Sequence, residues 1–338
     1  MSLEKFATYN EIKNQTEAWN QALELTKTAQ LPKADNYEQV IFTGCGSTYY
    51  LSLAAAALYQ ELTGRPARAV PGGELLLNPG TVVSNQKTLL IAISRSGTTT
   101  ETVKAVEAFT ANKNGDVLVI SNYEELLSQS ADISIVIPKG QEESVAQTGS
   151  FASMYVAAAG LSARMAGRND LIESMSSLSE VGERVIQKYE PYAQQLGENL
   201  AADRFYFLGS GIRYGLACEV NLKMKEMTLT HSEPFHFLEF RHGPMSMITK
   251  NTIVVGLVSG SNLKYEKAVL NEMEELGGKV VSVGEKDADI VFDSAVPEHI
   301  QGVLYLPVLQ LMAFYRSLAK GYNPDRPKNL EAVVKINL

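Results

Sequence analysis

Three ionisable side chains between residues 219 and 226 have the types and spacing of an acid–base centre. Glu219, Lys223 and Glu226 are separated by four and three residues, so in a helix they share one face. A carboxylate held beside an ammonium can take up and return a proton, which is the chemistry of general acid–base catalysis. The same spacing also occurs in ordinary surface salt bridges. The residues that follow favour the catalytic interpretation.

Three of the four histidines fall within twelve residues just after this group. His231, His236 and His242 are interleaved with Glu233 and Glu239, and the run ends in a Gly-Pro pair. The histidines could instead hold zinc, but their spacings of five and six residues match neither an HExxH motif nor a zinc finger. We therefore expect acid–base chemistry here, with no metal and no cofactor.

A second group of residues has the composition of an anion site. Five of the seven residues from Ser94 to Thr100 carry hydroxyls, and they lie between an apolar run and a helical pattern. Hydroxyls and free N–H groups at the start of a helix bind phosphate without bulk positive charge. Ser and Thr are also common helix caps that need no ligand, but their density here favours phosphate binding.

Both kinds of turn occur twice, 165 residues apart. Gly44-Cys45-Gly46 is matched by Gly209-Ser210-Gly211, and Ser94-Arg95-Ser96 by Ser259-Gly260-Ser261. Each turn follows a short apolar run, and further runs recur in the same order. Such runs predict buried parallel strands, here at residues 40–42, 89–93, 117–120, 133–137, 205–208, 253–258, 280–283 and 290–292. The chain is therefore expected to contain two copies of one α/β unit, with ligands bound at the carboxyl ends of the strands.

The predicted organisation has three parts. Residues 1–168 hold an N-terminal helix over 3–30 and the first α/β domain, residues 169–200 form linking helices, and residues 201–338 form the second domain with a C-terminal tail. The tail ends in an apolar run at 333–338 that predicts a strand.

Composition excludes several classes of function. The formal net charge is −8 and no basic stripe is present, so we expect no nucleic-acid partner. No run reaches the roughly 18 apolar residues of a membrane span, and the polar N-terminus does not resemble a signal peptide. We expect a cytoplasmic protein. Cys45 and Cys218 fit neither a disulfide framework nor a zinc site.

These motifs resemble those of the sugar isomerase (SIS) domain family, in particular the isomerase half of glutamine-fructose-6-phosphate aminotransferase, the glucosamine-6-phosphate deaminases and the fructosamine-6-phosphate deglycases. The resemblance rests on residues 44–48, 94–99, 142–151 and 219–244 and covers almost the whole chain. It implies two tandem doubly wound parallel-sheet domains of flavodoxin-like type, a phosphorylated amino sugar or fructosamine as substrate, and a homodimer.

The resemblance also implies roles for individual residues. Glu226 is the base that moves a proton between C1 and C2 of the open-chain sugar, and His242, supplied by the neighbouring subunit, opens the sugar ring. Lys223 and Glu219 position the helix face and the sugar hydroxyls. Ser94, Ser96 and Thr99 hold the 6-phosphate, with help from Ser47 or Thr48, and the loop that includes Val145, Ala146 and Gln147 contacts the sugar. Arg95, in the same phosphate loop, is counted among the substrate-binding residues.

Two positions depart from the family pattern. Residue 2 is Ser2, where the glutaminase part of the aminotransferases has a nucleophilic cysteine, so no glutaminase activity is expected. Any ammonia that the reaction uses or releases is therefore expected to be free ammonia. A family lysine near the C-terminus is replaced by Ala332, with Lys328 and Lys335 nearby. Three functions are therefore considered: deamination and isomerisation of glucosamine 6-phosphate, deglycation of a fructosamine 6-phosphate, and sensing of a sugar phosphate without catalysis. The two repeats and the acid–base helix favour an enzyme.

Overall fold

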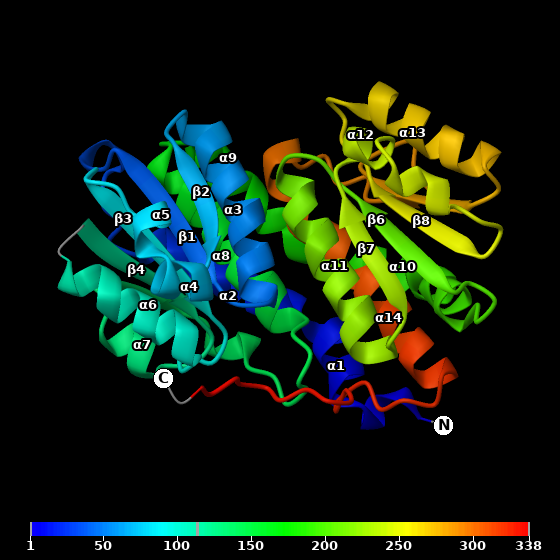
Figure 1. The fold of residues 1–338 in the computed structure, drawn as a ribbon, viewed down its shortest axis with the longest axis horizontal. Coiled ribbons are helices and arrows are strands. Elements are labelled where there is room, and N and C mark those ends of the chain that lie inside the picture. Colours follow the sequence, from blue (N-terminus) through cyan, green and yellow to red (C-terminus); the bar gives the residue numbers. More distant parts are fainter. Residues whose placement is uncertain (1, 113–114, 337–338) are drawn as a thin grey trace. The chain divides into compact units, whose positions relative to one another are not determined.

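The structure is a computed structural model that describes residues 2–112 and 115–336. It divides into two compact units, and each contains one sheet (Figure 1). The N-terminal unit comprises Asn14–Glu142, Gly149–Ser176 and Glu331–Leu338, and the C-terminal unit comprises Met1–Lys13, Glu143–Thr148 and Ser177–Leu330.

The sheet of the N-terminal unit has five parallel strands in the order β2-β1-β3-β4-β5. The strands are β1 (Gln39–Gly44), β2 (Ala67–Pro71), β3 (Thr88–Ser94), β4 (Gly115–Ser121) and β5 (Ile133–Val136). The helices are α2 (Thr16–Thr28), α3 (Ser47–Thr63), α4 (Gly72–Leu77), α5 (Pro79–Val82), α6 (Thr100–Ala111), α7 (Leu126–Gln129), α8 (Gly149–Met165) and α9 (Asn169–Ser174), with short 3₁₀ turns at Ala34–Asn36, Pro138–Gly140 and Met175–Ser177.

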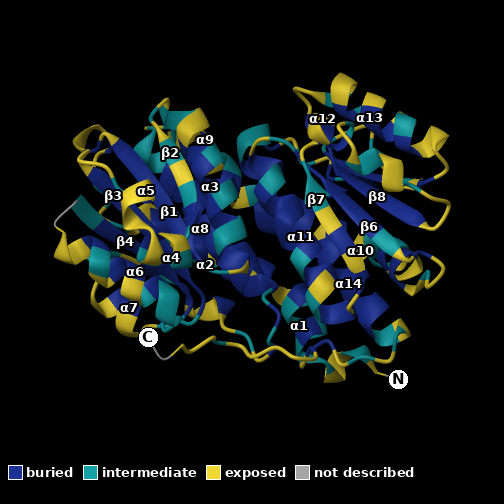
Figure 2. Cartoon of the chain, viewed as in Figure 1, coloured by how far each residue is buried: buried dark blue, intermediate teal, exposed yellow. Residues whose placement is uncertain are grey.

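Helices cover both faces of this sheet, which explains the continuous apolar runs. Helix α8 contacts α2 and α3, while α4 contacts α6 and, with the strands, encloses a core that includes Leu90, Val106 and Phe109. All seven residues of β3 are buried, and Figure 2 shows the central strands in the colour of buried residues. When both faces of a strand are buried, successive side chains are all apolar, so the sequence shows a continuous apolar run and no alternation of apolar and polar residues.

The sheet of the C-terminal unit is also parallel, in the order β10-β9-β8-β6-β7. Its strands are β6 (Arg204–Leu208), β7 (His231–Phe235), β8 (Thr252–Leu257), β9 (Lys279–Gly284) and β10 (Ile290–Val291). The helices are α1 (Ala7–Asn14), α10 (Leu178–Glu198), α11 (Ile212–Thr228), α12 (Phe237–Phe240), α13 (Leu263–Glu275) and α14 (Leu306–Ala319), with 3₁₀ segments at Leu3–Lys5, Pro244–Met247 and Glu298–Tyr305.

The two sheets share one topology. Numbered from its own first strand, each reads 2-1-3-4-5, which is the flavodoxin-like order of a doubly wound sheet. The prediction of two copies of a parallel α/β unit is confirmed, and all eight predicted strands are present. In this order the first and third strands are neighbours, so the turns that follow them lie next to each other at the carboxyl edge.

The sequence analysis missed β2 and β7, and both are edge strands. Only one residue of the five is buried in each, Val70 in β2 and Ser232 in β7. An edge strand exposes one side to solvent, so it lacks the apolar run that marks a central strand. It also tolerates Pro234, which cannot donate to a sheet ladder.

The predicted helix over residues 3–30 is wrong as a single element. It is a 3₁₀ turn followed by α1 and α2, interrupted at Phe6 and Gln15. The reason lies at the other end of the chain, because the Asp325 carboxylate accepts hydrogen bonds from the N–H groups of Ala7, at 3.1 Å, and Thr8, at 2.8 Å. This N-terminal cap starts a new helix at Ala7.

The predicted strand at the end of the tail is also wrong over residues 333–336, and residues 337–338 lie outside the described part of the chain. The Ile336 N–H donates to the hydroxyl of Thr100 at 3.2 Å, and the Ala332 carbonyl accepts from Arg95 at 2.9 Å. Side chains therefore satisfy this backbone where a strand would use a sheet neighbour.

One helical run among the described residues, Glu298–Ala319, has the length and apolar composition of a membrane span. Of its most apolar 18-residue window, 89% is buried inside the structure. Helix α14 within this run contacts α10 and α11, which is the environment of a core helix.

Candidate functional site

The glycine turn after β1 is built by its own residues. The Thr48 hydroxyl accepts from the Cys45 N–H at 2.9 Å and donates to the Cys45 carbonyl at 3.0 Å. A Cβ at Gly44 would lie 2.5 Å from Thr48 Oγ1, and Gly46 has φ +57°, so both positions require glycine. Ser47 and Thr48 are buried at the start of α3. Thr48 shapes the turn, and its hydroxyl is engaged within it.

The serine turn after β3 lies beside the glycine turn. Cys45 Sγ is 3.4 Å from the hydroxyl of Thr102 in the first turn of α6, which the serine turn precedes. The Ser94 hydroxyl is buried and accepts from the Gly97 N–H at 3.1 Å, whereas Ser96 and Thr99 are partly exposed. The first N–H groups of a twelve-residue helix have no partner within the helix. Together with the Ser96 and Thr99 hydroxyls they form a cradle for an anion.

Arg95 belongs to this turn by sequence but points to other partners. Its side chain is buried, with Nη1 3.7 Å from Glu142 Oε2 and Nη2 donating to the carbonyl oxygen of Ala332. Glu142 in turn accepts from the N–H and hydroxyl of Ser150. Arg95 thereby connects the loop before α8 with the C-terminal tail.

The predicted acid–base group forms on α11. Lys223 Nζ lies 3.3 Å from Glu219 Oε1 and 2.5 Å from Glu226 Oε2. The Lys223 and Glu219 side chains are 1% and 0% exposed, while Glu226 is 20% exposed. Burial lowers the pKa of the Lys223 ammonium, but the two carboxylates outweigh it, so the net shift of that pKa is upward. The buried ammonium therefore stays charged and fixes Glu226 at the surface of the helix.

A small pocket opens beside Glu226. Its volume is about 130 Å³, and its lining consists of the end of α11 and the segment after α14: Glu226, Met227, Leu229, Gly321, Tyr322, Asn323, Arg326 and Lys328. The ammonium of Lys328 lies 4.9 Å from the centre of the Tyr322 ring, a cation–π contact. The Glu226 carboxylate thus shares a pocket with two cationic side chains.

The predicted loop from Val145 to Gln147 packs against the same segment. The Val145 N–H donates to the Asp325 carbonyl at 3.1 Å, and Asp325 also caps α1. Gln147 is partly exposed, and its Oε1 is buried with no hydrogen-bond partner among the described residues. Residues from three distant parts of the chain therefore converge on the segment that lines the Glu226 pocket.

The histidines do not form a cluster. His231 begins β7 and His236 follows its end, and five residues of strand span about 16 Å. His236 stacks on the Tyr214 ring with centroids 3.8 Å apart, and His242 is exposed and absent from the lining of the Glu226 pocket. Within residues 2–112 and 115–336, no three His, Cys, Asp or Glu side chains are placed to hold a metal ion.

Glu226 is also distant from the second glycine turn. Fourteen residues of helix separate it from Ile212, which corresponds to about 21 Å. The acid–base face therefore lies toward the end of α11, away from the Gly209-Ser210-Gly211 turn that precedes it in sequence. Nearness in sequence to that turn therefore does not bring Glu226 close to it in space.

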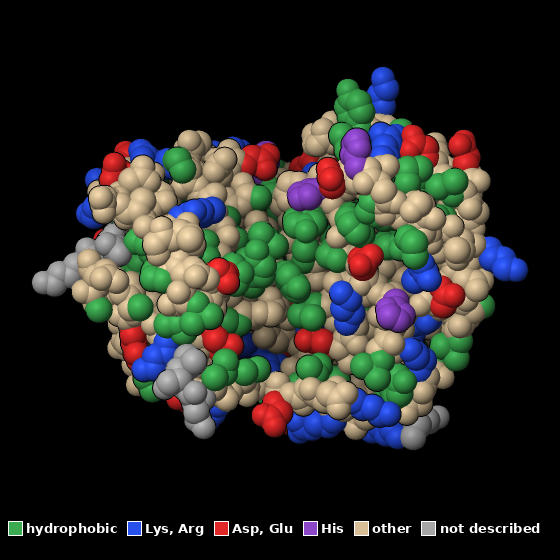
Figure 3. All heavy atoms as spheres, viewed as in Figure 1, with side chains coloured by type: hydrophobic (Ala, Val, Ile, Leu, Met, Phe, Trp, Pro, Cys, Tyr) green, Lys and Arg blue, Asp and Glu red, His purple; other side chains and the backbone are tan. Residues whose placement is uncertain are grey.

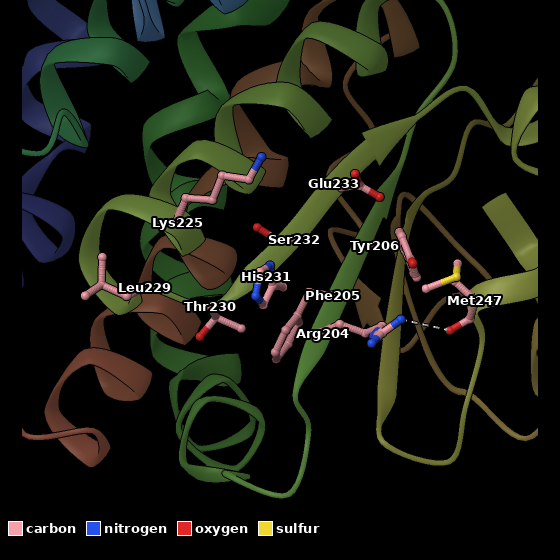
Figure 4. A pocket seen from close by; sticks show the side chains of 10 residues that line it. All are labelled: Arg204, Phe205, Tyr206, Lys225, Leu229, Thr230, His231, Ser232, Glu233 and Met247. Carbon is pink, nitrogen blue, oxygen red and sulfur yellow. Dashed lines mark hydrogen bonds between the residues drawn. The ribbon is translucent and has the colours of Figure 1, made fainter.

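A second pocket of 610 Å³ lies between the end of α11 and the β6–β7 edge of the sheet (Figure 4). Lys225 lines it from α11, Leu229 from the residue that follows the helix, and His231 and Glu233 from β7. Lys225 neighbours Glu226 in sequence but points to this pocket instead.

Over the face drawn in Figure 3, acidic and basic side chains are interspersed.

Several residues at the Glu226 pocket were not predicted. Tyr322, Asn323 and Arg326 come from an irregular segment with two prolines, and no spacing rule relates them to α11. The available signal was the density of polar and cationic residues between Tyr322 and Lys328. Without the fold, that density resembles an ordinary surface loop.

Comparison with known proteins agrees with this architecture. The model of the SIS domain family matches residues 35–164 and 200–319. The chain is 30% identical over 311 residues to "Glutamine--fructose-6-phosphate aminotransferase [isomerizing]" of Methanothermobacter thermautotrophicus, covering 88% of this chain and 52% of that protein. The chain thus spans about half the length of the curated relatives it matches.

Two solved structures match over nearly their full length. Glucosamine-6-phosphate deaminase from Thermotoga maritima superposes with a TM-score of 0.83 at 27% identity, covering 97% of this chain and 99% of that one. The C-terminal domain of glucosamine-fructose-6-phosphate aminotransferase from Francisella tularensis superposes with a TM-score of 0.85 at 22% identity, covering 95% and 98%. The second likeness concerns the fold alone. With a family match over both repeats and the same sheet order in each, the chain belongs to the SIS domain family.

Proposed function

We propose that the protein is a sugar-phosphate isomerase and deaminase that converts glucosamine 6-phosphate and water into fructose 6-phosphate and ammonia. The observation that carries this proposal is the Glu226 carboxylate, partly exposed at a pocket and held from behind by the buried Lys223 ammonium. The 27% identical structural relative bears the name glucosamine-6-phosphate deaminase, which supports the choice of substrate.

In this proposal Glu226 moves one proton. The carboxylate removes the proton from C2 of the open-chain aldehyde while O1 takes up a proton, giving an enolamine. It then returns its proton to C1 while the amine nitrogen releases one. The product is the C2 imine of fructose 6-phosphate, and water then adds to C2 and displaces ammonia. Lys223 stabilises the Glu226 carboxylate from the buried side of the helix. Glu219 is the second carboxylate that pairs with the same ammonium.

The 6-phosphate is assigned to the cradle after β3. Ser96 and Thr99 offer partly exposed hydroxyls, and the α6 N-terminus offers N–H groups that have no partner within the helix and a favourable dipole. Ser94, Ser47 and Thr48 support these donors by shaping the two turns. Arg95 acts as a positioning residue because its guanidinium already binds Glu142 and the tail.

The proton transfers of ring opening are assigned to His242 of a second copy of the chain. His242 is exposed and is not among the residues that line the Glu226 pocket. A homodimer in which each protomer lends His242 to its partner's site satisfies both observations. Val145, Ala146 and Gln147 are assigned to the sugar hydroxyls, with Gln147 Oε1 as acceptor.

The test is turnover of purified protein with 6-phospho amino sugars and fructosamines, following ammonia and hexose 6-phosphate. We expect stoichiometric release of both products from glucosamine 6-phosphate, and loss of at least about a hundredfold in kcat in Glu226→Gln. Calorimetric binding of a sugar phosphate without turnover of any compound would instead establish a sensor.

A second candidate, fructosamine-6-phosphate deglycase, is favoured by Ala332. The same carboxylate removes a proton from C1 of the ketosamine and returns it to C2, and hydrolysis of the resulting C1 imine gives glucose 6-phosphate and a free amine. Ketosamines need less help with ring opening than a cyclic amino sugar. A site in which position 332 carries no amine is therefore suited to them.

A further inference from the structure

The second repeat has its own copy of the anion cradle, and a side chain of the same unit fills it. Ser259 and Ser261 stand where the first repeat has Ser94 and Ser96, between β8 and α13. The Ser261 N–H donates to Glu298 Oε2 at 3.2 Å, and the Ser261 hydroxyl donates to Glu298 Oε1 at 3.2 Å. A backbone N–H and a hydroxyl before a thirteen-residue helix are the donors that a phosphate would meet there.

Arg213 completes the contact with Glu298. It stands 165 residues after Thr48, in the first turn of α11, and is 7% exposed. Its Nη2 donates to Glu298 Oε1 at 2.8 Å, and its Nε is buried with no hydrogen-bond partner among the described residues. A buried guanidinium requires a compensating anion, and Glu298 supplies it.

The turn has a shape that admits this carboxylate. Position 260 is glycine, and a Cβ there would lie 3.2 Å from Glu298 Oε2. The first repeat has Arg95 at the equivalent position. Its carboxylate at a comparable distance after the fifth strand, Glu142, accepts from Ser150 and pairs with the Arg95 side chain, not with Ser96. The two repeats therefore use one topology with different occupants of the turn.

We propose that the Glu298 carboxylate takes the place of a phosphate in the second cradle, so that this cradle is an anion site closed by the chain itself. It follows that each chain offers one open cradle to a sugar phosphate, the one after β3. Removal of the carboxylate leaves Ser261 without its acceptor and leaves the buried Arg213 guanidinium with Glu266 as its remaining carboxylate. The site then binds inorganic phosphate or a phosphate monoester.

A neighbouring carboxylate limits the strength of that binding. Glu266 Oε2 accepts from the Ser259 N–H at 2.6 Å and from the Ser259 hydroxyl at 3.0 Å. The Ser259 donors are therefore already used, and the charge of Glu266 opposes a second anion nearby. The opened site consequently relies on Ser261 and Arg213.

The test uses the full chain with the first cradle disabled by Ser96→Ala and Thr99→Ala. In this background Glu298→Ala is titrated with inorganic phosphate by ³¹P NMR, and we expect binding at least about tenfold tighter than in the parent. Adding Arg213→Ala should remove the gain. Glu274→Ala, on the exposed surface of α13, makes the same change in net charge and should leave binding at the parent level. A folded Glu298→Ala variant with parental phosphate binding overturns the proposal.

Two further measurements cover the case in which Glu298→Ala does not fold. Glu298→Gln keeps the side-chain size while removing the charge, and it should also bind phosphate more tightly than the parent. In the wild-type chain, hydrogen exchange of the Ser261 amide should be slowed by its bond to Glu298, and faster by about tenfold in Glu298→Gln. A wild-type Ser261 amide that exchanges like an unstructured peptide would show that Glu298 does not occupy the cradle.

Discussion

Arg95 donates a hydrogen bond from Nη2 to the carbonyl oxygen of Ala332 at 2.9 Å, joining residues 237 positions apart. The contact uses the backbone of residue 332, so it forms whichever side chain stands there. It directs residue 332 toward the loop after β3, while Lys328 lines the pocket beside Glu226. Lys328 is therefore the lysine of the tail that is placed to act at the Glu226 pocket.

Replacing Lys328 by Ala should lower kcat/KM at least about tenfold, because the Glu226 pocket loses a cationic group. Lys335→Ala should have less than about a twofold effect. Ala332→Lys should raise turnover of glucosamine 6-phosphate more than that of a fructosamine 6-phosphate. Steady-state kinetics of the three variants on both substrates measures this. Equal indifference to all three changes would mean that the site needs no lysine from the tail.

Removing the exposed hydroxyls of the first cradle should weaken phosphate recognition. Ser96→Ala combined with Thr99→Ala is expected to raise the Kd of a 6-phospho sugar at least about tenfold, since each hydroxyl donates to a charged group. Thr110→Ala, exposed near the end of the same helix, is the matched control. Calorimetric titration measures the Kd, and an unchanged value would contradict the phosphate assignment.

Mixing two inactive variants tests the shared site. In a hybrid dimer of Glu226→Gln and His242→Ala, one site contains both an intact Glu226 and an intact His242 from the partner. With random subunit exchange, half of the dimers are hybrids, so activity should recover to about a quarter of the wild-type value. Native mass spectrometry verifies the exchange. Hybrids that form but stay inactive would show that each site is built within one chain.

Lys223 should be essential for stability as well as for the site. Lys223→Met leaves the fully buried Glu219 carboxylate without its cation, and we expect a loss of about 3–5 kcal/mol in the free energy of unfolding. Lys225→Met, exposed on the same helix, should change it by less than about 0.5 kcal/mol. Urea denaturation followed by circular dichroism distinguishes the two. Similar midpoints for both variants would show that the ion pairs are not a structural element.

Glu266 should make stability depend on pH. Burial raises the pKa of its carboxyl, and the Ser259 hydrogen bonds and Arg213 only partly offset this. The folded chain then holds the proton more tightly than the unfolded chain, whose Glu pKa is 4.5. The contribution of Glu266 to the free energy of unfolding therefore falls as pH rises above 4.5. It levels off once the pH exceeds the pKa of Glu266 in the folded chain.

Urea unfolding of wild type and Glu266→Gln between pH 4.5 and 8 measures this effect. The variant should gain stability relative to wild type as pH rises, because glutamine has no charge to bury. Glu274→Gln on the exposed side of α13 should follow the wild-type curve. A difference between wild type and Glu266→Gln that stays constant with pH would contradict the raised pKa.

The repeated parallel fold and the acid–base helix could both be predicted from the amino-acid sequence. Central strands are buried on both faces, so their apolar runs are readable, and the 3.6-residue period places Glu219, Lys223 and Glu226 together without knowledge of any neighbour. The serine turn before α6 was equally local, because hydroxyl spacing and helix initiation act over a few residues.

The long-range contacts of these local features could not be predicted from the sequence and follow from the folded chain. The Lys328 side chain reaches the Glu226 pocket, Asp325 caps α1, and Glu298 enters the second cradle, each through contacts across tens or hundreds of residues. Edge strand β7 could not be predicted from an apolar run because one of its sides faces solvent. Its five residues place His231 and His236 at opposite ends of the strand. Such pairings depend on chain topology, which no local period or spacing encodes.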